Sequence, residues 1–131
     1  MTATRQRILL VDLSELERHE LWDRLTLAGF DVMIALNHAD VCLRLLTWRP
    51  HGVIADADLS SMALPQLANL IRTSTPVPLF VVFLCAAEPS RDVGATILLK
   101  PAAFADLLAT LRSSLADDDE PAGGWTTPAA D

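Results

Sequence analysis

Four short, continuous apolar runs constrain the fold of this chain more than any other feature. They occupy residues 8–11, 53–55, 79–84 and 96–99, and a fifth, more ambiguous run of strand length covers residues 31–36. Their hydrophobic residues are consecutive rather than alternating, which is typical of strands buried on both faces of a parallel sheet. Because 51% of the 131 residues are hydrophobic, the chain has enough apolar side chains to build such a core.

Helical patterns separate these runs. A capping box from Ser14 to Glu17 opens a pattern that stops at Gly29, and further patterns cover residues 39–48, 64–71 and 103–115. Alternating strands and helices predict a doubly wound α/β domain with right-handed crossovers. Only eleven residues, 85–95, separate the last two runs, and they include Pro89 and Gly94. We therefore expect the helix between these strands to be shortened or missing.

The composition changes near the end of the chain. Residues 117–131 hold five acidic and no basic residues, so we predict a folded domain over 1–116 and an acidic disordered tail over 117–131. Trp125 is either an ordinary tail residue or an aromatic docking anchor. The net charge is −7 and no basic cluster is evident, which argues against binding to nucleic acid.

The sequence also predicts where in the cell the protein is located. The longest apolar run, residues 79–87, is far shorter than the roughly 20 residues of a membrane-spanning helix. The amino-terminal residues do not resemble a signal peptide, because no apolar stretch of roughly 7–15 residues precedes Asp12. We therefore expect a cytoplasmic protein with no membrane partner.

Charged residues follow the predicted strands. Asp12 follows the first run, Asp56 and Asp58 follow the third, and Lys100, the only lysine among ten basic residues, follows the last. The carboxyl ends of parallel strands meet at one edge of the sheet, so these side chains are expected to converge there. Clustered carboxylates can hold Mg²⁺, and a carboxylate beside a metal can attack phosphorus to form an acyl phosphate. The alternative is a set of ordinary solvated acids at strand ends.

Three segments together resemble the receiver domain of two-component response regulators. They are Ile-Leu-Leu-Val-Asp at 8–12, His-Gly-Val-Ile-Ala-Asp at 51–56, and Leu-Leu-Lys-Pro at 98–101. The resemblance implies a flavodoxin-like sheet of order 2-1-3-4-5. It also implies that Asp56 accepts a phosphoryl group, that Lys100 contacts it, and that Asp12, Asp56 and Asp58 surround a weak or absent Mg²⁺ site. The bond before Pro101 is a candidate cis peptide, as in the family.

The chain also departs from the family pattern. Leu13 replaces the second acid of the metal site, and Glu15 or Asp58 is left as a possible substitute. The hydroxyl residue that the family carries after its fourth strand is Phe83 or Cys85 here, and neither donates a good O–H hydrogen bond. The aromatic switch position is Ile97. The resemblance thus implies an atypical, stand-alone receiver with a partly degenerate site.

Two functions follow from this resemblance. The first is a signalling module, not itself an enzyme, that takes a phosphoryl group from a histidine kinase on Asp56. The second is a pseudo-receiver that acts through phosphorylation-independent protein contacts. A flavin carrier is disfavoured, because the acidic loop from Asp12 to Glu17 would repel a flavin phosphate.

Loss of the helix before the last strand also has a predicted consequence. It would expose apolar sheet surface around Val81, Phe83 and Ile97, and such a patch is usually a partner site. We therefore predict a homodimer or a tight partner at the face formed by the fourth and fifth strands. We interpret the histidines and cysteines as surface, cap or core residues, with a redox role for Cys85 as the less favoured reading.

Overall fold

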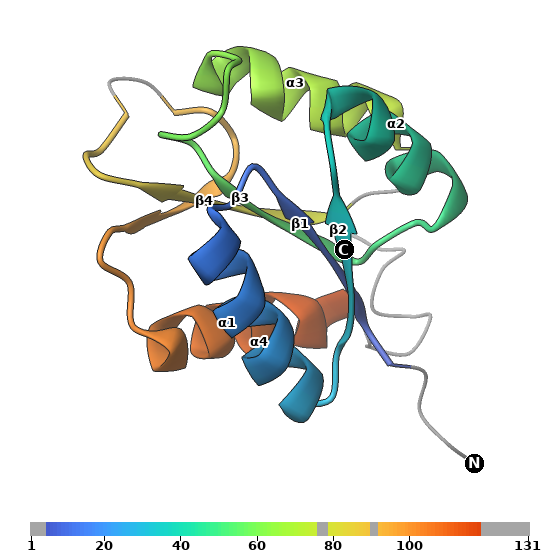
Figure 1. Cartoon of the computed structure of the whole chain (residues 1–131), viewed down its shortest axis with the longest axis vertical. Helices are drawn as coiled ribbons and strands as arrows, with labels where there is room; N and C mark the ends of the chain where they lie inside the picture. The colour runs from blue at the N-terminus through green and yellow to red at the C-terminus, as the bar shows by residue number, and fades with distance from the viewer. Residues whose placement is uncertain (1–4, 76–78, 90–91, 119–131) are drawn as a thin grey trace.

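The computed structural model describes residues 5–75, 79–89 and 92–118. Within them, five parallel strands lie between two layers of helices (Figure 1). The strands are β1 (Arg7–Val11), β2 (Asp31–Ala35), β3 (Gly52–Asp56), β4 (Phe80–Cys85) and β5 (Thr96–Leu99). The helices are α1 (Glu15–Leu27), α2 (His38–Thr47), α3 (Leu64–Ser74) and α4 (Phe104–Asp118).

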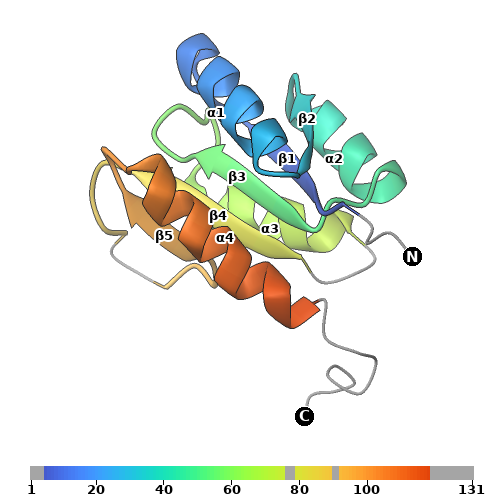
Figure 2. The same cartoon turned by 90° about the horizontal axis from the view of Figure 1, so that it is seen from below.

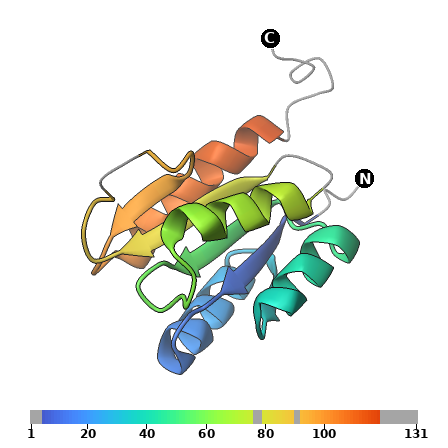
Figure 3. The same ribbon diagram turned by 90° about the horizontal axis from the view of Figure 1, so that it is seen from above.

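The strand order β2-β1-β3-β4-β5 confirms the predicted doubly wound, flavodoxin-like sheet. Helices α1 and α4 cover one face of the sheet (Figure 2), and α2 and α3 cover the other (Figure 3). The predicted capping box is present at the start of α1, where Ser14 accepts from the Glu17 amide and Glu17 accepts from the Ser14 amide. In this fold, every strand points its carboxyl end toward the same edge.

Each face of the sheet has its own apolar core. On one face, Leu9, Val53 and Phe83 pack with Leu45 of α2 and Leu67 of α3. The other face has a second core, formed by Ile8, Leu10, Ile54, Val82, Leu25, Leu107, Leu111 and Leu115. Because β1, β3 and β4 are buried on both faces, their sequences read as continuous apolar runs.

The connection from β4 to β5 contains no helix among its described residues, 86–89 and 92–95. Its second part lies against the sheet instead, because Val93 and Ala95 pack on the core cluster that contains Phe83. The Arg72 guanidinium of α3 donates a hydrogen bond to the Val93 carbonyl. Gly94 adopts a φ of 73°, a left-handed conformation that favours glycine at this turn.

This packing overturns the predicted exposed patch. Val81 and Phe83 are buried, with 9% and 0% of their surfaces exposed, and Ile97 is partly buried. The prediction was wrong because it assumed that the sheet face stays uncovered when the helix is missing. An irregular segment supplies apolar side chains there instead. The large hydrophobic residue of β4 and β5 that remains exposed is Leu99.

The last helix continues to Asp118, past residue 116, where the sequence placed the end of the folded domain. Of the tail predicted to be disordered, residues 119–131, which include Trp125, lie outside the described residues. No helix in the described part of the chain is long and apolar enough to cross a membrane.

Candidate functional site

The carboxyl edge of the sheet carries the predicted site residues. Asp56 is the last residue of β3, Asp12 follows β1, and Lys100 follows β5. The Lys100 amide donates to the Cys85 carbonyl at 2.7 Å, which carries the β4–β5 pairing one residue further. The bond between Lys100 and Pro101 is cis. Strand pairing thus fixes where the lysine side chain begins.

Lys100 bonds to both oxygens of the Asp56 carboxylate. Its Nζ lies 3.0 Å from Oδ1 and 2.9 Å from Oδ2. The Asp58 and Leu59 amides also donate to Asp56 Oδ1, at 2.9 and 3.3 Å. Asp56 is only 1% exposed and is the one buried charged residue in the described part of the chain. Such a carboxylate requires a partner cation and hydrogen bonds, and it has both.

Asp58 shares the same ammonium group. Its Oδ2 lies 2.9 Å from Lys100 Nζ and accepts from the Ala86 amide at 2.8 Å. The hydrogen bond to Asp56, reinforced by the one to Asp58, raises the pKa of Lys100 above its usual value. The hydrogen bond from Lys100 lowers the pKa of Asp58. One ammonium therefore faces two carboxylates, and the three groups carry a net charge of about −1 at neutral pH.

Asp12 points to a different partner. Its Oδ2 lies 3.1 Å from Nε2 of His38, the first residue of α2. An ionised carboxylate only accepts hydrogen bonds, so Nε2 is the donor here. Asp12 itself has a φ of 56°, a conformation that is uncommon for residues with a side chain. Leu13, which occupies the position of the family's second acid, packs against the core beside α1 and α4.

This arrangement does not fit a Mg²⁺ ion. Among the described residues, no group of three or more His, Cys, Asp and Glu side chains is placed to hold a metal. The predicted set of Asp12, Asp56 and Asp58 is divided between two protein partners, His38 and Lys100. Glu15, exposed at the start of α1, does not replace the missing acid.

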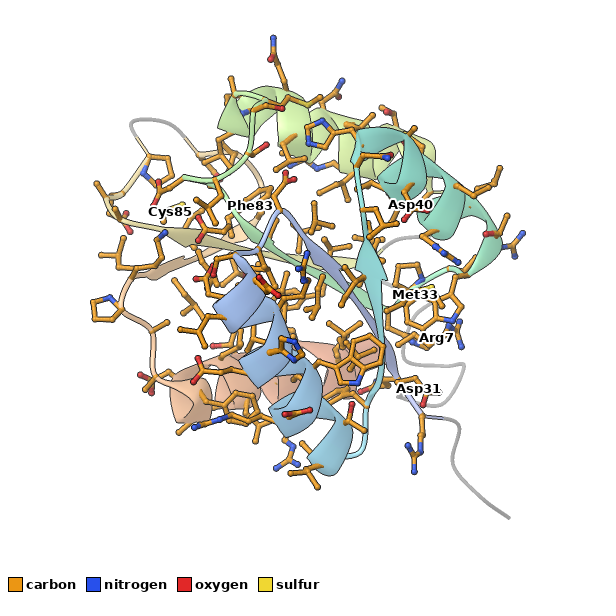
Figure 4. The ribbon with its side chains drawn as sticks, viewed as in Figure 1. Arg7, Asp31, Met33, Asp40, Phe83 and Cys85 are labelled. Carbon is orange, nitrogen blue, oxygen red and sulfur yellow. The ribbon has the colours of Figure 1, made fainter. Side chains whose placement is uncertain are left out.

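The three predicted switch positions occupy different surroundings. Phe83 is fully buried in the core and pairs in register with Ile97. Cys85 ends β4 one residue beyond Leu84, the register partner of Asp56 (Figure 4). Of Phe83 and Cys85, the two candidates for the family's hydroxyl position, Cys85 is therefore the one that borders the site. Burial, followed by the negative charges of Asp58 and Asp56, raises the pKa of its thiol, which opposes thiolate chemistry.

Sequence reasoning missed His38 as a member of the site. We interpreted it as a surface or cap residue, and it does begin α2 directly after the Asn37 N-cap. The signal that points to it is its position three residues after β2, at the same carboxyl edge as Asp12. The contact itself depends on how α2 packs, which a single sequence does not specify.

Comparisons with known proteins support the receiver resemblance. No protein-family model and no curated protein matches the chain. Among solved structures, the chain is similar to the amino-terminal domain of a response regulator/sensory box/GGDEF three-domain protein from Carboxydothermus hydrogenoformans. The identity is 27%, the TM-score is 0.71, and the match covers 85% of this chain and 94% of that one.

Two further solved structures share the fold at lower identity. A two-component response regulator from Clostridium difficile matches with a TM-score of 0.77 at 18% identity, covering 88% of this chain and 100% of that one. The chemotaxis protein CheY4 from Vibrio cholerae matches with a TM-score of 0.72 at 23% identity, covering 84% and 98%. The chain therefore shares the fold of response-regulator receiver domains.

Proposed function

We propose that this chain is a pseudo-receiver, a cytoplasmic module of two-component signalling that acts through protein contacts and catalyses no reaction of its own. The observation that carries this proposal is the division of the site. Asp56 and Asp58 are bonded to Lys100, while Asp12 is bonded to His38. The carboxylates that would surround a metal in a receiver are already bonded to protein groups.

The chemistry of phosphorylation explains why this division matters. An aspartate that attacks phosphorus needs a free carboxylate oxygen, and the transferring group needs cations around its oxygens. Both Asp56 oxygens accept from Lys100, and one accepts two amides as well. Attack would require the carboxylate to leave these donors, and the described residues provide no set of metal ligands beside it to replace them. The geometry therefore favours a structural role for Asp56.

A second candidate keeps Asp56 as a phosphoacceptor for a histidine kinase. It is favoured by Lys100, whose ammonium sits directly on both carboxylate oxygens and whose side chain is 27% exposed. After phosphorylation, the same ammonium could pair with phosphoryl oxygens. In this candidate, the added charge would reorder the loop at Asp58 and change a binding face.

The contact surface that we assign to the pseudo-receiver is the open edge of β5. No described strand pairs with its outer side, and Thr96–Leu99 contains no charged residue or proline to discourage pairing. Leu99 is 47% exposed at its end. A second copy of the chain is the partner that we expect there, because two such edges can pair across a two-fold axis.

Intact-mass spectrometry decides between the two functions. The full chain is incubated with acetyl phosphate and Mg²⁺, in parallel with the Asp56→Asn variant. The pseudo-receiver predicts no phosphoryl adduct in either protein. An adduct on the full chain that is absent from Asp56→Asn establishes the phosphoacceptor instead.

Light scattering after size exclusion tests the β5 edge. We expect a dimer that Leu99→Lys converts to a monomer. Leu43→Lys on α2 is the matched control, because Leu43 has a similar exposure, 53%, and is far from β5 in the fold. A monomer at high concentration, or equal effects of the two variants, would exclude this contact.

A further inference from the structure

The opposite edge of the sheet carries a cluster of arginines that the proposed function does not use. Arg7 begins β1, and its guanidinium reaches the end of α2. Its Nε lies 3.0 Å from the Trp48 carbonyl, and its Nη2 lies 2.9 Å from the Arg49 carbonyl. The Arg49 backbone is therefore held beside the Arg7 guanidinium, and Arg5 lies two residues before Arg7 in the chain. We call Arg5, Arg7 and Arg49 the arginine edge.

Negative charge at this edge is scarce among the described residues. The described hydrogen-bond partners of the Arg7 and Arg49 guanidinium groups are backbone carbonyls, and the Arg49 contact to Leu46 is long, at 3.4 Å. Arg5 has one carboxylate, Asp31, at 3.6 Å, and both side chains are more than half exposed. Arg7 and Asp31 begin neighbouring strands, on the same side of the molecule (Figure 4). Among the described residues, only one of the three guanidinium groups, that of Arg5, therefore has a carboxylate partner.

The last helix ends at this same edge. The Gln6 side chain, between Arg5 and Arg7, donates to the Leu115 carbonyl of α4 at 3.1 Å. The chain then continues as Asp117-Asp-Asp-Glu120, and residues 117–131 contain no basic residue. The Gln6 contact places the last turn of α4 beside the start of β1, next to the residues that carry the Arg5 and Arg7 side chains, so the acidic segment begins near the arginine edge.

The end of α4 also has an electrostatic reason to need a nearby cation. Asp117 and Asp118 belong to α4, and its last turn contains no basic residue. The carboxyl end of a helix carries partial negative charge, so acidic residues there are unfavourable unless positive charge compensates them. The arginine edge is a described source of such charge near Leu115.

We propose that the acidic segment 117–120 docks in cis on the arginine edge. Carboxylates suit guanidinium groups because the planar fork donates two parallel hydrogen bonds. The contact bridges the end of α4 to the end of α2, on opposite faces of the sheet, and covers a surface that would otherwise attract acidic partners. It lies at the edge of the sheet away from Asp56 and stands independently of the proposed function.

Amide NMR of the full chain tests this contact. The variant D117N/D118N/D119N/E120Q replaces the four acidic side chains with neutral amides of similar size. At low salt we expect the Trp48 and Arg49 amides to shift relative to the native chain. These shifts should vanish at about 1 M NaCl, where the Debye length is about 3 Å. Shifts confined to α4, Gln6 and the mutated segment would overturn the proposal, because they require only proximity.

Thermal melting is an independent test, because docking and simple repulsion from the helix dipole predict changes of opposite sign in the melting temperature. If the segment docks, the neutralised variant melts at a lower temperature than the native chain at low salt. If the acids only repel the helix dipole, the variant melts at a higher temperature, and the proposal fails.

The reciprocal substitution completes the test. Arg49→Gln should move the Asp119 and Glu120 amides toward their high-salt positions. Arg18→Gln, on α1, is the control of equal charge change. Equal effects of both variants would assign the shifts to net charge and exclude docking.

Discussion

The candidate site has two sides, and only one of them keeps the residues expected of a receiver. On the lysine side, Lys100 joins Asp56 and Asp58 through three contacts of 2.9–3.0 Å. On the metal side, Leu13 packs into the core and Asp12 is bonded to His38. A buried carboxylate needs a cation whatever the function of the protein, whereas metal ligands are needed only if a metal is used. The comparison teaches that the lysine pair alone does not identify a phosphoacceptor.

The largest expected effect comes from removing the cation on the lysine side. Lys100→Met leaves the buried Asp56 carboxylate unpaired, which should lower the free energy of unfolding by about 3 kcal/mol or more. Urea denaturation measures the loss. The control is D56N/K100M, in which both charges are absent and most of the stability should return. If the single and double variants lose the same amount, the pair is not what holds this side together.

Rebuilding the metal side should produce a smaller gain. L13D/H38A restores the second acid and frees Asp12, so Mg²⁺ should bind and stabilise the variant. With a dissociation constant of about 1 mM, 10 mM Mg²⁺ would add about 1.4 kcal/mol. The native chain should show no change in melting temperature with Mg²⁺. Stabilisation of the native chain by the ion would show that its metal side still works.

The contributions of Lys100 and Asp58 to stability should change in opposite directions with pH. Because the pKa of Lys100 is raised, its contribution is complete below its unfolded pKa, about 10.4, and is lost as pH rises through the folded value. The pKa of Asp58 is lowered, so its smaller contribution is present above about pH 4 and is lost as pH falls further. Melting curves of the native chain and Lys100→Met should converge in strong alkali. A constant gap would contradict the coupling.

The smallest effect concerns the thiol that borders the site. Cys85 should react with a thiol reagent more slowly than Cys42, because it is buried and its pKa is raised. Reaction rates of the Cys42→Ala and Cys85→Ala variants, each with one thiol left, provide the measurement. Faster reaction at Cys85 would mean that this end of β4 opens readily.

Much of the fold was predictable because it depends on local patterns. Four continuous apolar runs and a fifth, more ambiguous one predicted the five strands, and the capping box placed the start of α1. Strand ends also identified Asp56, Asp58 and Lys100 as neighbours, since parallel strands share one carboxyl edge. The covering of Phe83 by Val93 and the pairing of Asp12 with His38 were not predictable. Both depend on how an irregular segment or a helix end packs, for which the sequence carries no periodic signal.

We propose that the divided site does not support metal-dependent phosphorylation. The most direct measurement is the intact mass of the full chain after incubation with acetyl phosphate and Mg²⁺, beside the Asp56→Asn and L13D/H38A variants. We predict that the native chain gains no phosphoryl group. A phosphoryl adduct on the native chain that disappears in Asp56→Asn would contradict the claim and make Asp56 a working phosphoacceptor.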